Sequence, residues 1–159
     1  MMLYLSTMLQ LLSKVFIGRR DRLSPRIAKL LEWSEQATAH NTDTTLVLAL
    51  DYGGRWDVSE AASALAHDVE AGRLRAEDID ETSLSARMSL ADQPTLDLCI
   101  RTGGEYRLSN FLLWQSAYAE LWFTKTLWPD FTVEELDVAI DHFAGRERRY
   151  GGRPAEAHS

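Results

Sequence analysis

Short apolar runs along this chain alternate with longer segments in which apolar positions recur every three or four residues. Runs of apolar and β-branched residues predict β-strands, whereas the longer period predicts amphipathic helices. Strands are expected over residues 44–50, 96–100 and 120–124. Strands that alternate with helices in this way indicate an α/β fold, in which a parallel β-sheet is flanked by helices.

Residues with capping character locate the predicted helices. Ser24 is followed by a proline, which is the arrangement of an N-cap before the first helical turn. Asp57 with Glu60, and Thr132 with Glu135, have the spacing of a capping box. The helices expected from these signals and from the apolar period span residues 24–40, 57–72, 79–88, 110–118 and 132–150.

The first fifteen residues have a helical apolar period and predict an amphipathic leader helix. The leader has neither a basic start nor a small-residue cleavage site, so it does not resemble a secretory signal peptide. It is too short and too polar for a membrane span. We expect it to pack on the core or on a partner, with contact to a membrane surface as the alternative. Residues 153–159 are expected to form a disordered tail.

Composition narrows the class of protein. A chain of 159 residues that is 45% hydrophobic and 26% charged is expected to form one domain, in the cytoplasm. A net charge of -7 argues against a general nucleic-acid-binding protein, which needs a basic face. The one cysteine, Cys99, lies in a predicted strand and is expected to be a buried, reduced thiol. No cluster of cysteine and histidine has the spacing of zinc ligands.

The turn after the strand at residues 96–100 has the residues of an anion site. Arg101 and Arg107 carry guanidinium groups, which make charge-assisted, bidentate hydrogen bonds to phosphate oxygens. Gly103 and Gly104 allow the backbone to approach a ligand closely. Ser109 is expected to open the helix at residues 110–118, whose first amides would face the same place. The pattern predicts a diphosphate site.

The same stretch carries a family resemblance. The segments IRTGGEYRLSNFLLWQSAYAELWF, LWPDF and RERRYGG are similar to the C-terminal signature of the cis-prenyltransferases, the undecaprenyl diphosphate synthase family. FIGRRDRLSP and LDYGGRWDV also resemble that family. The resemblance covers residues 16–152 and implies the C-terminal part of a cis-prenyltransferase domain. Residues 1–15 do not resemble the family.

The resemblance implies roles for particular residues. Family members condense isopentenyl diphosphate with an allylic prenyl diphosphate, with the assistance of Mg²⁺, to give undecaprenyl-like polyprenyl diphosphates. Glu120 matches an acidic residue that helps to hold the metal. The residues that match the isopentenyl diphosphate site are Arg101, Arg107, Ser109 and, through its backbone, Leu108. The C-terminal RxG element, which reaches into a partner subunit's active site, is matched by Arg149 and Gly151.

Plainer interpretations of these residues stay open. Arg101 and Arg107 could be surface arginines that pair with Glu105. Ser109 could be only an N-cap, and Glu120 only a solvated carboxylate at a strand start. Three arginines (Arg146, Arg148, Arg149) could form no more than a solvated helix end.

Two family motifs are missing from this sequence. No segment of the form DGNGRW, which carries the family's catalytic aspartate, and none of the form FSTENW precedes Phe16. DYGGRW matches a later family segment, so Asp51 is not assigned as a catalytic residue and none is assigned. We expect a truncated prenyltransferase with little or no activity alone, which would form a homodimer or a heterodimer with a complete family member. The alternatives are a non-catalytic subunit that donates the RxG element and an inactive gene fragment.

Overall fold

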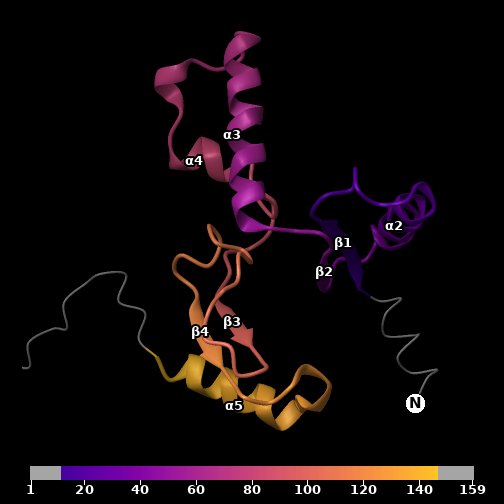
Figure 1. Ribbon diagram of the computed structural model, residues 1–159, viewed down its shortest axis with the longest axis vertical. Helices are drawn as coiled ribbons and strands as arrows, with labels where there is room; N and C mark the ends of the chain where they lie inside the picture. The colour runs from indigo at the N-terminus through magenta and orange to yellow at the C-terminus, as the bar shows by residue number, and fades with distance from the viewer. Residues whose placement is uncertain (1–11, 147–159) are drawn as a thin grey trace, which may run out of the picture. The chain divides into compact units, whose positions relative to one another are not determined.

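The computed structural model describes residues 12–146 and divides the chain between Gln93 and Pro94 into two compact units. Each unit combines a two-stranded parallel sheet with helices, which confirms the α/β class (Figure 1). The first unit contains β1 (Ser13–Ile17), α2 (Pro25–Thr38), β2 (Thr45–Ala49), α3 (Gly54–Glu70) and α4 (Glu81–Ser85). The second contains β3 (Leu98–Arg101), β4 (Glu120–Phe123) and α5 (Val133–Ala144). Two short 3₁₀ turns lie at Ala76–Asp78 and Trp128–Asp130.

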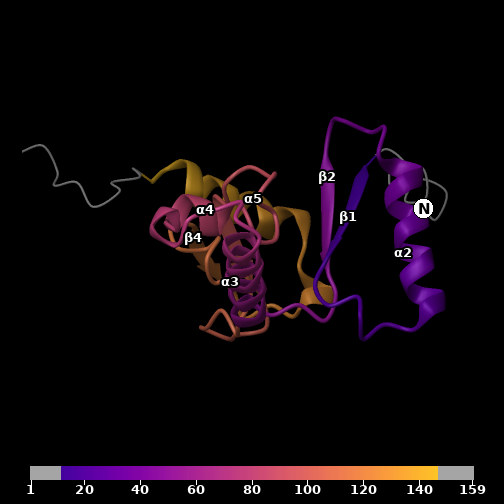
Figure 2. The ribbon, with the colours of Figure 1, turned by 90° about the horizontal axis from the view of Figure 1, so that it is seen from above.

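The first unit begins with a β-α-β arrangement. β1 and β2 pair in parallel from Ser13 with Thr45 to Ile17 with Ala49, and α2 connects them. Figure 2 shows α2 lying along the strand pair. Gly18 follows β1 with a φ of 109°, and a Cβ there would lie 2.1 Å from the Leu50 carbonyl oxygen. The close passage of the chain beside the end of β2 therefore requires glycine.

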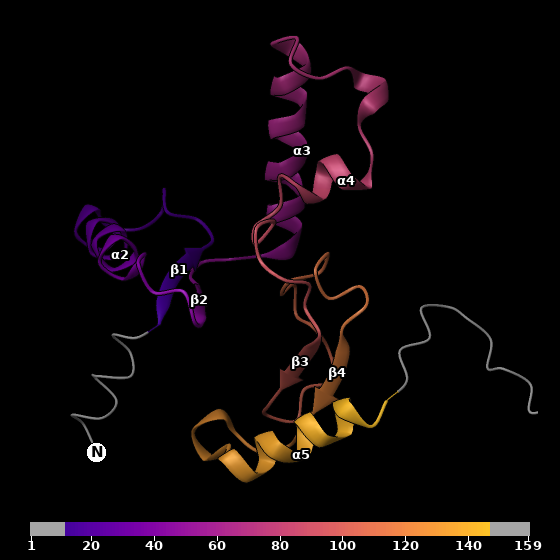
Figure 3. The same ribbon diagram turned by 180° about the vertical axis from the view of Figure 1, so that it is seen from behind.

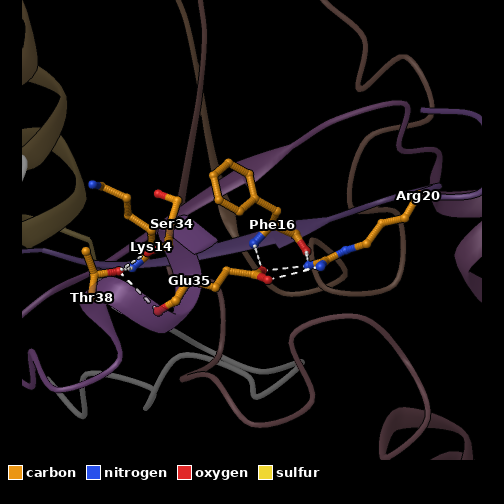
Figure 4. Close-up of polar contacts among 6 residues, drawn as sticks. All are labelled: Lys14, Phe16, Arg20, Ser34, Glu35 and Thr38. Carbon is orange, nitrogen blue, oxygen red and sulfur yellow. Dashed lines mark hydrogen bonds and ion pairs between the residues drawn. The ribbon is translucent and has the colours of Figure 1, made fainter. Parts of the chain in front are cut away.

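Side chains of α2 occupy the outer edge of β1 (Figure 4). The Lys14 N–H donates to Thr38 Oγ1 at 3.1 Å, and the Phe16 N–H donates to Glu35 Oε1 at 2.9 Å. Arg20 Nη1 donates to Glu35 Oε2 at 3.0 Å and so holds that carboxylate in place. These two amides point away from β2, on the side of β1 that has no partner strand among the described residues. An unpaired strand edge can form hydrogen bonds with a strand of another chain. The helix therefore closes this edge of the sheet.

Local capping signals predicted two helix starts correctly. Ser24 Oγ accepts from the Ile27 N–H at 3.4 Å, and α2 follows with proline in its first turn. Thr132 and Glu135 form the expected capping box at the start of α5. Both signals depend on residues within one helical turn, so they act wherever the helix packs. The two helices end at Thr38 and Ala144, earlier than the expected residues 40 and 150.

The predicted capping box of Asp57 and Glu60 is wrong. α3 begins earlier, at Gly54, with Gly53 as its N-cap, and this places Asp57 inside the helix. Asp57 is buried, and its carboxylate accepts from the Tyr52 hydroxyl at 2.8 Å and from the Ser89 N–H at 2.9 Å. The capping geometry fails because the carboxylate is used to connect α3 with the segment that follows α4.

The leader helix expected over residues 1–15 differs from the structure where the structure describes it. Ser13, Lys14 and Val15 are the first residues of β1, and they pair with Thr45–Val47 of β2. A partner strand provides hydrogen bonds to these residues, and β-branched Val15 suits a pleated surface. Residues 1–11 lie outside the described residues.

The helix predicted over residues 110–118 is also wrong. Ser109, Asn110 and Leu112 have positive φ angles of 51°, 64° and 44°, which no right-handed helix contains. A series of turns replaces the helix, including a bond from the Ser116 N–H to the Leu112 carbonyl at 2.8 Å. Apolar helices are stabilised mainly by packing of one face, and here Phe111 and Leu113 stay exposed.

In the second unit α5 lies beside the strand pair in both Figure 1 and Figure 3. Residues progressively earlier in the β4 region contact residues progressively later in α5 and just beyond it. Thr126 donates to Glu135, the ring of Trp122 lies 4.9 Å from that of His142, and Glu120 pairs with Arg146. The helix is therefore antiparallel to β4.

None of the helices between residues 12 and 146 is long and apolar enough to cross a membrane.

We expect Glu35→Gln to lower the free energy of unfolding by about 1 kcal/mol, because a neutral amide weakens the charge-assisted bonds to Arg20 and the Phe16 N–H. Urea unfolding measures the loss, and hydrogen exchange of the Phe16 amide localises it. Glu32→Gln, an exposed change of the same charge on the same helix, is the matched control. An equal loss of unfolding free energy in Glu35→Gln and Glu32→Gln would contradict the role given to the Glu35 hydrogen bonds.

The stabilisation by Glu35 should depend on pH. Burial acts to raise the pKa of this carboxyl, but hydrogen bonds from Arg20 and from the Phe16 N–H, with the Arg20 charge, lower it further than burial raises it. A lowered pKa contributes stability that is complete above the unfolded value of about 4.3 and is lost as the pH falls through the folded value. The difference between wild type and Glu35→Gln should therefore shrink on acidification below about pH 4.3. A difference that stays constant into strong acid would rule this out.

Candidate functional site

The candidate site lies at the C-terminal end of β3 and in the turn that follows it. Arg101 is the last residue of β3. Gly103 and Gly104 have φ angles of 84° and 74°, which suit glycine, and their amides donate to the carbonyls of Thr126 at 2.8 Å and Thr124 at 2.9 Å. The turn is thereby tied to the segment after β4. These two amides brace the turn and are not free to bind a ligand.

Two of the predicted ligands meet in this turn. Arg101 Nη2 donates to Ser109 Oγ at 3.3 Å, across eight residues of sequence. Ser109 does not cap a helix, and its positive φ of 51° is a conformation that L-residues seldom adopt. Its hydroxyl is held beside the guanidinium group instead. A cationic donor and a hydroxyl therefore lie together at one strand end, and both are groups that can donate hydrogen bonds to an anion.

Arg107 has a different environment. Its guanidinium group forms an ion pair with Glu105, and the Arg107 side chain is 67% exposed. This is the plainer pairing that the sequence left open for the arginines, and it applies to Arg107. Leu108 lies between Arg107 and Ser109 and is half-buried. An ion pair this exposed contributes little stability, so an anion of higher charge can compete for the arginine.

Glu120 is not placed with these residues. The register pairs Leu98 with Glu120 and Arg101 with Phe123. Paired residues share a face and successive residues alternate, so Glu120 lies on the opposite face of the sheet from Arg101. Arg146 Nη1 donates to Glu120 Oε2 at 3.0 Å, and Arg146 Nη2 lies 3.4 Å from His142 Nε2. The carboxylate therefore faces α5.

The surroundings of the Glu120 carboxylate bear on the magnesium role that the family resemblance implies for it. A magnesium ion prefers several oxygen ligands in octahedral geometry. Between residues 12 and 146 no group of three or more histidine, cysteine, aspartate or glutamate side chains could hold a metal ion. The one candidate carboxylate, Glu120, has a guanidinium partner. The described residues offer Glu120 alone, already paired with Arg146, and do not form a magnesium site by themselves.

Cys99 lies in β3 two residues before Arg101 but is not one of the predicted site residues. The thiol is half-buried, and burial raises its pKa, an effect that the charge of Arg101 opposes only in part. A thiol with a raised pKa is a poor nucleophile. Cys99 is less buried than the sequence predicted.

Sequence reasoning missed the partner of Glu120. Arg146 is 26 residues away, and the spacing signals nothing because it depends on how α5 lies along β4. Tyr106 was also missed, although its ring lies 5.5 Å from that of Phe123 and supports the turn from the Arg101 face. A basic residue at the end of a helix was the only available signal for Arg146. Arg149 and Gly151, the predicted RxG residues, lie outside the described residues.

Comparisons with known proteins agree on one family. Residues 7–151 match the family model described as "Putative undecaprenyl diphosphate synthase", ahead of the boundary expected at residue 16. The (2E,6E)-farnesyl-diphosphate-specific ditrans,polycis-undecaprenyl-diphosphate synthase of Xanthomonas axonopodis is 55% identical over 136 residues, which are 86% of this chain and 53% of that protein. The synthase of the same name from Acinetobacter baylyi is 53% identical, over 86% of this chain and 55% of its own length.

A solved structure is similar to this chain in its fold as well as in its sequence. Lavandulyl diphosphate synthase from Lavandula x intermedia, in complex with dimethylallyl diphosphate, superposes with a TM-score of 0.83 at 36% identity, over 88% of this chain and 60% of that one. The chain spans about half the length of the curated relatives it matches. Its sequence and fold show that the chain belongs to the undecaprenyl diphosphate synthase family of prenyltransferases.

Proposed function

We propose that the turn after β3 binds the diphosphate group of isopentenyl diphosphate for cis-prenyl transfer. In that reaction isopentenyl diphosphate condenses with an allylic prenyl diphosphate: a carbon–carbon bond forms, the allylic carbon–oxygen bond breaks, and diphosphate and a proton leave. The products are poly-cis-polyprenyl diphosphates. The observation that carries the proposal is the contact between Arg101 and Ser109 at 3.3 Å, at the end of a β-strand.

The proposed binding uses side chains more than backbone amides. Arg101 and Ser109 present donors at one place, while the amides of Gly103 and Gly104 are used by the turn itself. Arg107 joins them by leaving Glu105, because a bidentate bond to phosphate is stronger than an exposed ion pair. The role of these residues is to hold and orient the diphosphate.

Mg²⁺ belongs to this proposal as the cofactor of the transfer, and no step is routed through Glu120, because that carboxylate is paired with Arg146 on the face opposite Arg101. A homodimer, or a heterodimer with a complete family member, and a cytoplasmic location belong to the same proposal.

A second candidate function is that of a non-catalytic subunit, which donates the RxG element of Arg149 and Gly151 to a complete chain.

An elongation assay with farnesyl diphosphate and labelled isopentenyl diphosphate distinguishes these functions. We expect the purified chain to bind isopentenyl diphosphate but to elongate the primer weakly or not at all. Enhanced turnover when the chain is mixed with a complete family member would favour the subunit function. Full-rate elongation by the chain alone would contradict the expectation.

The arginines of the turn should determine affinity. Arg101→Ala and Arg107→Ala should each lose a charge-assisted bond of about 1.5–3 kcal/mol, which weakens isopentenyl diphosphate binding by about 10- to 150-fold. Titration calorimetry measures this, and circular dichroism checks the fold. Arg75→Ala, which removes an exposed arginine that also pairs with a nearby glutamate, is the control. Unchanged affinity in either turn variant removes that residue from the site.

Glu120 should affect stability and not binding. Glu120→Gln removes an ion pair that is 24% exposed on the glutamate side, and we expect a loss of about 0.2–1 kcal/mol with unchanged isopentenyl diphosphate affinity. A double-mutant cycle with Arg146→Met should assign this loss to the pair. If Glu120→Gln weakened diphosphate binding as strongly as Arg101→Ala, the separation of the two faces would not hold.

A further inference from the structure

Positive charge is concentrated at the beginning of α2. Residues 19–29 contain five of the 17 lysines and arginines of the chain, with Asp21 as their one acidic residue, although the net charge is -7. Such an asymmetry produces a local basic surface on an acidic protein. These residues belong to the first unit, whereas the residues of the proposed diphosphate site belong to the second.

Ion pairs account for only part of this charge. Arg19 pairs with Asp21, Arg20 with Glu35, and Arg22 with Asp51. Two further cations, Arg26 and Lys29, are exposed on α2, and no salt bridge found between residues 12 and 146 involves either of them.

Helix stability does not explain the position of these cations. The first turn of α2 contains no acidic residue. The positive end of the helix dipole lies there, where it disfavours a cation such as Arg26.

Large apolar side chains lie beside the two unpaired cations on the helix surface. Leu30 is 56% exposed and Trp33 is 65% exposed. Arg26, Leu30 and Trp33 are spaced at i, i+4 and i+7 and form one stripe along the helix, with Lys29 beside it. The buried residues of α2, Leu31 and Thr38, lie on the face toward the sheet. Arg26, Lys29, Leu30 and Trp33 therefore form an outer face of α2 that combines exposed apolar area with unpaired positive charge.

We propose that this outer face of α2 docks on an anionic lipid membrane. Tryptophan prefers the level of the lipid headgroups, a leucine beside it can enter the acyl boundary, and basic residues around them attract anionic headgroups. Charge complementarity supports this occupant: the face is basic and an anionic lipid surface is negative, and the membrane also offers an apolar interior to Leu30 and Trp33. The two apolar residues fit a surface with an apolar interior better than a nucleic acid.

The test is co-sedimentation of the full chain with vesicles of phosphatidylcholine, alone or mixed with phosphatidylglycerol. We expect binding to the mixed vesicles only, weakened by added salt. Arg26→Gln with Lys29→Gln should lower the partition coefficient by about 30-fold, as the loss of two surface cations implies. Val133→Ser, which removes a 69% exposed apolar side chain from acidic α5, should bind as the wild type does.

A fluorescence experiment gives a second readout. The mixed vesicles should shift tryptophan emission to the blue in the wild type, and Trp33→Phe should lose most of the shift while it keeps its circular dichroism spectrum. Inorganic phosphate should compete no better than chloride at equal ionic strength. Equal binding to both vesicle types, no effect of the double substitution, or specific displacement by phosphate would each overturn the proposal. Binding of the chain to an acidic protein, with no binding to either type of vesicle, would also overturn the proposal.

Discussion

The parallel pairing of β3 with β4 determines which groups of the second unit can act together. With Leu98 opposite Glu120 and Arg101 opposite Phe123, strand alternation sends Arg101 to one face and Glu120 to the other. One face carries the arginine and the braced turn, and the other is covered by α5 through Trp122 and Arg146. A slip of one residue would exchange the two faces, so the register is as important to the site as the identity of its side chains.

In the first unit the corresponding constraint is the contact of α2 with β1. Glu35 and Thr38 accept from the Phe16 and Lys14 amides, so the helix is held by side-chain acceptors as well as by apolar burial. This contact also fixes the orientation of α2. With Leu31 and Thr38 directed to the sheet, Leu30 and Trp33 must lie on the exposed side.

The sequence predicted what depends on neighbouring residues. The starts of α2 and α5 and the end of β3 follow from signals within a few positions. Arg101 and Ser109 meet across the loop of a single short segment, eight residues apart. Features that depend on distant packing were not predictable. The apolar segment after Ser109 has a helical pattern, yet it forms a series of turns that buries Leu112 and leaves Phe111 exposed. The pairing of Glu120 with Arg146 requires the direction of α5. Asp57 has a capping pattern, yet tertiary hydrogen bonds determine its place.

The closed edge of β1 has a consequence for assembly. Its outward amides are occupied by α2, whereas no strand among the described residues pairs with the far side of β2. This small sheet can therefore be extended in one direction only. Two copies that met through β2 would each present the blocked edge of β1 to the outside, so this particular sheet could not grow beyond the pair.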